Sequence, residues 1–193
     1  RILAVNLFAL ALMASGLFFL DSYRTRLVAE RQAAAETQVK LLATSLAAMS
    51  DEADAATLAN FARTEKLRVR LYGPDGAKTY DSNSRTGPTF QLIDPANEPW
   101  RKTAARWMDR GFDFIVLAPN LEQYREPSND VGSAWPELAG IKVNQSTSLV
   151  RFAPDLTHVV TAATLLPDGQ TRILTTGNPR DVRALVRAER FSI

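Results

Sequence analysis

The sequence lacks cysteine altogether, and it contains a single histidine, His158, among its 193 residues. The absence of cysteine excludes disulfides, thiolate metal sites and a cysteine nucleophile. One histidine argues against a histidine–carboxylate metal centre, and neither a glycine-rich phosphate loop nor a nucleophile-elbow motif occurs. We therefore expect no catalytic residue, no metal and no cofactor in this segment.

An excess of one charge is also missing. The 23 Lys and Arg residues against 21 Asp and Glu give a net charge of +2. Basic residues do not cluster in a stretch typical of nucleic-acid binding, so no nucleic-acid partner is expected. With 46% hydrophobic and 23% charged residues, the composition is that of an ordinary globular domain.

Charge is absent from residues 2–20, ILAVNLFALALMASGLFFL. As a helix this run would measure about 28 Å, close to the ~30 Å hydrocarbon core of a bilayer. A signal peptide would have a shorter apolar region, of about 7–15 residues, before a small-x-small cleavage site. This run is longer and ends in Phe18-Phe19-Leu20-Asp21. It predicts a transmembrane helix over residues 1–20, and we expect both ends of the sequence to lie inside a longer chain.

Residues 21–53 predict a long helix that continues from the membrane, because they contain no Gly or Pro and are rich in strong helix formers. One stripe at heptad spacing comprises Val28, Gln32, Ala35, Val39, Leu42, Leu46, Met49 and Ala53. A weaker stripe comprises Leu27, Ala34, Leu41 and Ala48. One stripe could pack on the chain's own domain and the other on a second copy. We take Val28, Ala35, Val39, Leu42, Leu46 and Met49 as the dimer contacts of a homodimer; the alternative is an amphipathic helix without a dimer.

The pattern then changes from helical to extended. A short helix is predicted over 55–64 with Asp54 as its N-cap. Strands are predicted over 67–72 and 78–82, joined by the turn Gly73-Pro74-Asp75-Gly76, and again over 149–153, 157–166 and 170–176.

Two further segments complete the prediction. Residues 83–140 form an insertion that contains a helix opening at Asn97 and an apolar run over 112–117. Residues 179–193 form a C-terminal helix, centred on 180–190, that leads to a second, absent membrane span. The fold class is α+β: a transmembrane helix continuing into a long helix packed on a five-stranded antiparallel PAS-like sheet, with residues 54–178 as an extracellular sensor domain.

The polar face of the first strand is the best candidate for binding a small anion. Arg68, Arg70 and Tyr72 alternate along it, and Arg151 is expected on a neighbouring strand. Guanidinium groups bind carboxylates and phosphates bidentately. The alternative is a solvated face with cross-strand salt bridges.

Several titratable residues are candidates for sensing pH. His158 has an imidazole that changes charge in mild acid, and Asp155 or a neighbouring strand could tune it. The alternative is an exposed strand histidine beside a turn. Carboxylates clustered in pairs would also titrate at raised pH; the candidates are Asp109, Asp113, Glu122 and Glu126.

Five short segments resemble the ChvG/ExoS type of alphaproteobacterial sensor histidine kinase. They are Trp135-Pro136-Glu137-Leu138-Ala139, Tyr124-Arg125-Glu126, Val150-Arg151-Phe152, Val186-Arg187-Ala188-Glu189-Arg190 and Leu71-Tyr72-Gly73-Pro74-Asp75-Gly76. The resemblance implies an inner-membrane protein with a periplasmic sensor domain, a second span, a HAMP linker and a kinase module that phosphorylates a response regulator. It also implies a response to acidity or envelope stress, with a periplasmic regulatory protein as a possible partner.

Two other classes of protein fit the same pattern. One is a single-pass membrane-anchored periplasmic binding or scaffold protein without a kinase. The other is the sensor domain of a chemoreceptor or of a cyclic-dinucleotide enzyme. The part of the parent chain after residue 193 would separate these classes from a kinase.

Overall fold

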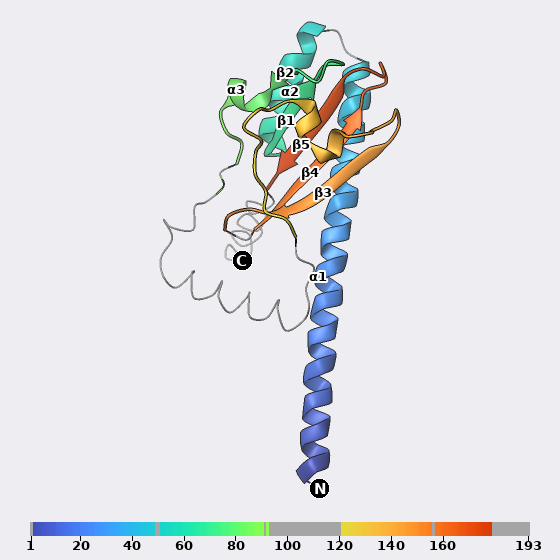
Figure 1. Cartoon of the computed structure of the whole chain (residues 1–193), viewed down its shortest axis with the longest axis vertical. Helices are drawn as coiled ribbons and strands as arrows, with labels where there is room; N and C mark the ends of the chain where they lie inside the picture. Colours follow the sequence, from blue (N-terminus) through green and yellow to red (C-terminus); the bar gives the residue numbers. More distant parts are fainter. Residues whose placement is uncertain (1, 49–50, 91, 93–120, 156, 179–193) are drawn as a thin grey trace, which may run out of the picture. The chain divides into compact units, whose positions relative to one another are not determined.

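The computed structural model describes residues 2–48, 51–90, 92, 121–155 and 157–178 (Figure 1). The chain divides into two compact units, residues 1–31 with 95–120 and residues 32–94 with 121–193. The helix predicted at Asn97, the apolar run over 112–117 and the helix over 180–190 all lie outside the described residues.

Helix α1 runs without interruption from Ile2 to Ala47. This confirms the prediction that the apolar run and the following amphipathic stretch form one helix, but the helix ends at Ala47 and not at residue 53 as predicted. Large apolar side chains of the first unit are 58–75% exposed at Leu3, Val5, Leu7, Phe8, Leu10, Leu12, Met13, Phe18 and Phe19. Within the described part of the chain, no helix is both long and apolar enough to cross a membrane.

Helix α2 spans Asp51–Thr64. It begins earlier than predicted, so Asp54 lies inside the helix and the prediction that it is the N-cap was wrong. The run of Asp, Glu and Ala residues around Asp54 contains no helix breaker, which explains why the helix extends back past it.

The five strands are β1 (Leu67–Tyr72), β2 (Lys78–Asp81), β3 (Ser146–Phe152), β4 (His158–Leu165) and β5 (Arg172–Gly177). They form one sheet in the order β2-β1-β5-β4-β3, and all neighbouring pairs are antiparallel. This confirms the α+β class and the five antiparallel strands. In the predicted turn between β1 and β2, Gly76 has a φ of 80°, a conformation that glycine adopts without strain.

The short helix α3 (Ser82–Thr86) was not predicted. Asp81 ends β2 and caps α3, because its carboxylate accepts a hydrogen bond from the backbone N–H of Asn83. Ser82 therefore belongs to the helix rather than to the strand. Its hydroxyl accepts a hydrogen bond from the backbone N–H of Val69 on β1.

The sheet is buried on both faces. On one face α1 and α2 form a core of Val39, Leu42, Ala43, Leu46, Leu58, Ala62, Val69, Ala162 and Ile173. On the other face the 121–138 segment, with the single turns η2 (Gly132–Ala134) and η3 (Pro136–Leu138), covers the strands. There the core comprises Tyr72, Tyr124, Trp135, Leu138, Ala153, Val159, Ala163 and Leu174.

The structure assigns the main heptad stripe to the chain's own core rather than to a dimer contact. Val39, Leu42 and Leu46 are at most 5% exposed in the core between α1 and the sheet. Ala35 packs against the same core and Val28 is half-buried, while Met49 lies outside the described residues. The reason is that the face of β1 bearing Val69 offers an apolar surface to this stripe. In the weaker stripe, Ala34, Leu41 and Ala48 are exposed, Leu41 to 65%, and Leu27 is half-buried.

Candidate functional site

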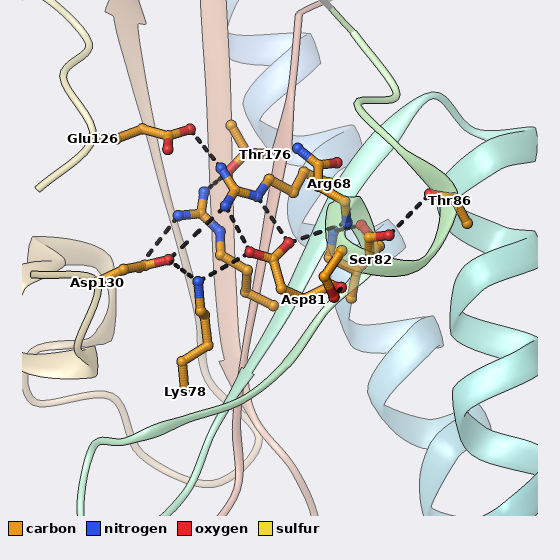
Figure 2. A network of polar contacts seen from close by, with 12 residues as sticks. Arg68, Lys78, Asp81, Ser82, Thr86, Glu126, Asp130 and Thr176 are labelled. Carbon is orange, nitrogen blue, oxygen red and sulfur yellow. Dashed lines mark hydrogen bonds and ion pairs between the residues drawn. The ribbon is translucent and has the colours of Figure 1, made fainter. Parts of the chain in front are cut away.

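Alternate residues of β1 point into the covered face of the sheet, as the sequence pattern predicted. Arg68, Arg70 and Tyr72 all lie on this face, under the 121–138 segment. The face is not solvated, since Arg70 and Tyr72 are both 0% exposed. These side chains belong to a network of ion pairs and hydrogen bonds that we call the Asp130 network: Arg68, Arg70, Tyr72, Lys78, Asp81, Tyr124, Glu126, Asp130, Trp135 and Thr176. Figure 2 shows part of it, with Arg68, Lys78, Asp81, Glu126, Asp130 and Thr176 labelled.

Arg68 is bound by two carboxylates. Its Nε and Nη2 donate to Oδ1 and Oδ2 of Asp81 at 3.0 and 2.6 Å, and its Nη1 donates to Oε1 of Glu126 at 2.6 Å. The hydrogen bonds to Asp81 raise the pKa of Arg68 further above its usual value, and the hydrogen bond to Glu126 adds to this against the opposing effect of burial. The bidentate pair with Asp81 crosses the β1–β2 hairpin and joins its two strands.

Asp130 accepts hydrogen bonds from three different side chains at short distance. Its Oδ1 accepts from Oη of Tyr72 at 2.6 Å and from Nε1 of Trp135 at 2.8 Å. Its Oδ2 accepts from Nζ of Lys78 at 2.8 Å. Burial opposes ionisation of this carboxyl, but the hydrogen bonds outweigh burial and lower the pKa of Asp130 well below its usual range.

Lys78 bridges two carboxylates of the network, those of Asp81 and Asp130. Figure 2 shows it between Asp130 and Asp81, and its Nζ lies 3.0 Å from Oδ2 of Asp81. Burial favours the neutral amine, but hydrogen bonds to both carboxylates raise the pKa of Lys78 overall. The pKa of Asp81 is lowered, since its bonds to Arg68 and Lys78 outweigh the effect of burial.

Arg70 is fully buried, yet no carboxylate among the described residues makes a short hydrogen bond with its guanidinium. Its one short hydrogen bond runs from Nη2 to Oγ1 of Thr176 at 2.8 Å, while its contacts to Asp130 and to Oη of Tyr124 are both 3.5 Å. Its Nε makes no hydrogen bond to any described residue. The guanidinium lies 4.3 Å from the ring centre of Trp135, a cation–π contact that partly compensates for lost hydration.

Arg151 does not join this network. Sequence reasoning placed it on a strand next to β1, but β5 and β4 separate β1 from β3. Arg151 instead donates from Nη1 to Oε1 of Glu137 at 2.5 Å, and Thr161 also donates to that oxygen. Burial opposes ionisation of Glu137, but the bonds from Arg151 and Thr161 outweigh it, so the pKa of Glu137 is lowered.

Two of the segments quoted for the resemblance therefore contact one another. In Trp135-Pro136-Glu137, the tryptophan binds the Asp130 network and the glutamate binds Arg151 of β3. Pro136 fixes the turn between them as the first residue of η3. This one short segment thus links both charged clusters to the sheet.

The pH-sensing candidates lie in different places. The ring of His158 packs on Phe152, with ring centres 5.2 Å apart. Asp155 accepts hydrogen bonds from the backbone N–H and the hydroxyl of Thr157, at 3.2 and 2.6 Å. Glu122 is exposed, and Asp109 and Asp113 lie outside the described residues.

Among the described residues, the charged partner of Glu126 is Arg68; a carboxylate pair with Asp109 or Asp113 lies outside the described residues. Sequence reasoning also missed Lys78, Asp81, Asp130 and Glu137. Of these, only Asp81 had a local signal, because it lies near the end of the strand predicted over 78–82 and next to a Ser-Asn-Ser stretch. Among the described residues, no group of three or more acidic or histidine side chains is placed to hold a metal ion.

The lowered pKa values predict how stability depends on pH. As pH falls, the unfolded chain binds protons on these carboxyls first, at about pH 4 for ordinary Asp and Glu. The stabilisation from Asp81, Asp130 and Glu137 is therefore complete above about pH 5 and is lost progressively below about pH 4. Thermal unfolding at a series of pH values should show the melting temperature falling steeply only in that acid range.

The variant Asp130→Asn is the control for this pH dependence. It should melt at a lower temperature than the wild type at pH 7. Its melting temperature should also fall less on acidification, because the carboxyl of Asp130, whose pKa is lowered by folding, is gone. An acid transition near pH 6 that Asp130→Asn abolishes would contradict the lowered pKa of Asp130.

Comparison with known proteins gives one match. Residues 1–53 match the family model described as the sensor N-terminal transmembrane domain. No curated protein and no solved structure matches the chain. The match indicates a sensor protein of the kind found in signalling kinases, located at a membrane.

Proposed function

We propose that this chain is the membrane-anchored sensory part of a sensor histidine kinase of the ChvG/ExoS type. The observation that carries the proposal is the family match over residues 1–53, which covers the whole of α1. In this proposal the protein lies in the bacterial inner membrane, with residues 54–178 in the periplasm. The kinase module belongs to the longer parent chain, and the response regulator that it phosphorylates is a separate cytoplasmic partner.

The uncharged run over residues 2–20 is the proposed membrane anchor. Nine large apolar side chains in it are exposed, which is unfavourable in water and favourable in lipid. The described residues alone contain no helix that meets the requirements of a span. The run contains no charged residue in the sequence, and it lies within the residues that match the family.

The sheet domain is the proposed sensor. A five-stranded antiparallel sheet with a long N-terminal helix on one face supports a PAS-like architecture. Helix α1 contains both the proposed anchor and the core stripe of Val39, Leu42 and Leu46, so a change in sheet packing would move the helix that enters the membrane. A small piston or rotation of this kind is a known way of transmitting a signal.

Acidity is the stimulus we propose, with envelope stress or a periplasmic regulatory protein as the other inputs implied by the resemblance. The lowered pKa values of Asp81 and Asp130 keep these two carboxylates ionised in mild acid, so we take His158 as the stronger candidate in the described part of the chain. Its neighbour Phe152 is hydrogen-bonded through the backbone to Glu122 and Tyr124. Protonation of His158 could therefore act on the segment that covers the sheet.

The experiment that tests this function uses the full-length parent protein in membrane vesicles. Acidification of the sensor side should change phosphotransfer to the response regulator, and His158→Gln should remove that change while Glu122→Gln keeps it. Resistance of the protein to alkaline carbonate extraction would support the anchor. A parent chain without a kinase module, or a chain released by carbonate, would overturn the proposal.

A homodimer is part of the proposal, with the contact moved to the weaker stripe of α1. Leu27, Ala34, Leu41 and Ala48 succeed each other at heptad spacing, and Leu41 is exposed. Since the chain has no cysteine, a single Leu41→Cys substitution reports the dimer without background. We expect Leu41→Cys to form a disulfide-linked dimer in oxidised membranes and Leu42→Cys, which is buried, to form none. Equal cross-linking at both positions would contradict this contact.

A further inference from the structure

Asp130 fills a position that is built for a carboxylate. Donors from four side chains surround its two oxygens: Tyr72, Trp135 and Arg70 at Oδ1, and Lys78 at Oδ2. A hydroxyl, an indole N–H, a guanidinium and an ammonium are all hydrogen-bond donors in this arrangement. Such a set is suited to an anion with two oxygens, and β1, β2 and the 121–138 segment each contribute to it.

The position needs a negative charge. Without Asp130 the network would contain three cations, Arg68, Arg70 and Lys78, against the two carboxylates Asp81 and Glu126. The remaining excess is one positive charge, and most of it falls on Arg70, which makes no other ion pair among the described residues. A buried guanidinium without a counter-ion is strongly unfavourable. A monoanion is therefore the charge that fits.

Arg70 indicates that Asp130 does not fill the position completely. Its side chain is 0% exposed, its distance to Oδ1 of Asp130 is 3.5 Å, and its Nε is unpartnered among the described residues. A carboxylate that approached Arg70 more closely could make the short bidentate contact that Asp130 does not make. The position is also reachable, since the side chain of Asp130 is 20% exposed.

We propose that the Asp130 network is a binding site for a small monocarboxylate, in which Asp130 is an internal competitor that occupies the site when no ligand is bound. An arriving carboxylate takes the donors of Tyr72, Trp135 and Lys78, and Asp130 moves away to solvent. This deepens the proposed function by naming a class of ligand. Binding itself does not depend on the proposed function; only the claim that binding acts as a signal rests on it.

The exchange has a structural consequence in the segment that covers the sheet. Asp130 ties the 121–138 segment to the β1–β2 hairpin through Tyr72 and Lys78, and Gly132 adds one backbone bond to Gly76 at 2.8 Å. Replacing Asp130 by a free carboxylate removes its bonds to Tyr72 and Lys78 and keeps the charge balance, while the ion pair of Arg68 with Glu126 still holds the segment to β1. Ligand binding would thus loosen this segment without unfolding the sheet.

The test uses the full chain in mild detergent, with sodium acetate as the probe and sodium chloride at equal ionic strength as the reference. Asp130→Ala should melt below the wild type, and acetate should raise its melting temperature by several degrees with saturation. The matched control is Asp168→Ala, which removes an exposed turn carboxylate bound by Thr171 and should respond to acetate only as weakly as the wild type does. The NMR signal of the Trp135 indole N–H, assigned by its loss in Trp135→Phe, should shift over the same range of acetate concentrations.

In the wild type the same signal should shift only at acetate concentrations at least about tenfold higher, because the tethered Asp130 competes at a high effective concentration. This titration decides the matter if Asp130→Ala does not fold. No acetate-specific shift in either protein, an equal response in Asp168→Ala, or an equal response to inorganic phosphate would overturn the assignment to a carboxylate. None of these readouts depends on kinase activity or on membrane insertion, so a failure here is distinct from a failure of the proposed function.

Discussion

Replacing Glu137 by alanine is expected to lower the free energy of unfolding by about 3–5 kcal/mol. The carboxylate side chain is 0% exposed and its partner Arg151 is 10% exposed, so the substitution leaves a buried guanidinium without a counter-ion. Thr161 loses an acceptor at the same time. Urea unfolding of the full chain in mild detergent, monitored by circular dichroism, would measure the loss.

Two control variants separate charge from packing at this site. Glu137→Gln keeps the side-chain volume and an acceptor for Arg151, so we expect a smaller loss, of about 1–3 kcal/mol. The double variant Glu137→Met with Arg151→Met removes both charges, and its stability should return close to that of the wild type. The wild-type pair is itself imperfect, because Oε2 of Glu137 has no hydrogen-bond partner among the described residues. A decrease in the free energy of unfolding of less than about 1 kcal/mol in Glu137→Ala would show that water hydrates the guanidinium of Arg151 in place of Glu137.

The second large effect is expected in the core between α1 and the sheet. Leu42→Ala should lower the free energy of unfolding by about 2–5 kcal/mol, because it removes a side chain that is only 4% exposed and leaves a cavity against the sheet. The neighbouring variant Leu41→Ala is the matched control. Leu41 is 65% exposed, and its loss should change stability by less than about 0.5 kcal/mol.

Measuring both leucine variants at several protein concentrations also tests the proposed dimer. An effect of Leu41→Ala that increases with protein concentration would report a contact with a second copy rather than with the chain's own core. Equal losses in the two variants at all concentrations would contradict the orientation of α1 described here.

The local pattern of the sequence was sufficient for most of the sheet domain. Strict alternation predicted that Arg68, Arg70 and Tyr72 share a face of β1, and they do. The residues of the turn at Gly73–Gly76 predicted its position, since only a few residues adopt positive φ easily. The strands β3 to β5 were each found within about three residues of their true ends, an error usual for element boundaries.

The partners of these side chains could not be predicted in the same way. Asp130 is separated by 58 residues from Tyr72 and by 60 from Arg70, and nothing periodic in the 121–131 stretch identifies it. The same holds for Glu137: its segment resembled a known family, but its partner Arg151 lies 14 residues away on β3 and no spacing indicates the pair. Burial of these carboxylates results from the path of the 121–138 segment across the sheet.

By itself, the sequence determined the helical and extended segments, the two stripes of α1 and the alternation of β1, because each depends on spacing along the chain. The tertiary structure alone decided which stripe is buried, which strands separate Arg151 from Arg70, and which carboxylates neutralise the arginines. Those outcomes depend on the order β2-β1-β5-β4-β3 and on the segment that covers one face of the sheet. A charged side chain finds its counter-ion through contacts in space, and spacing along the chain does not encode them.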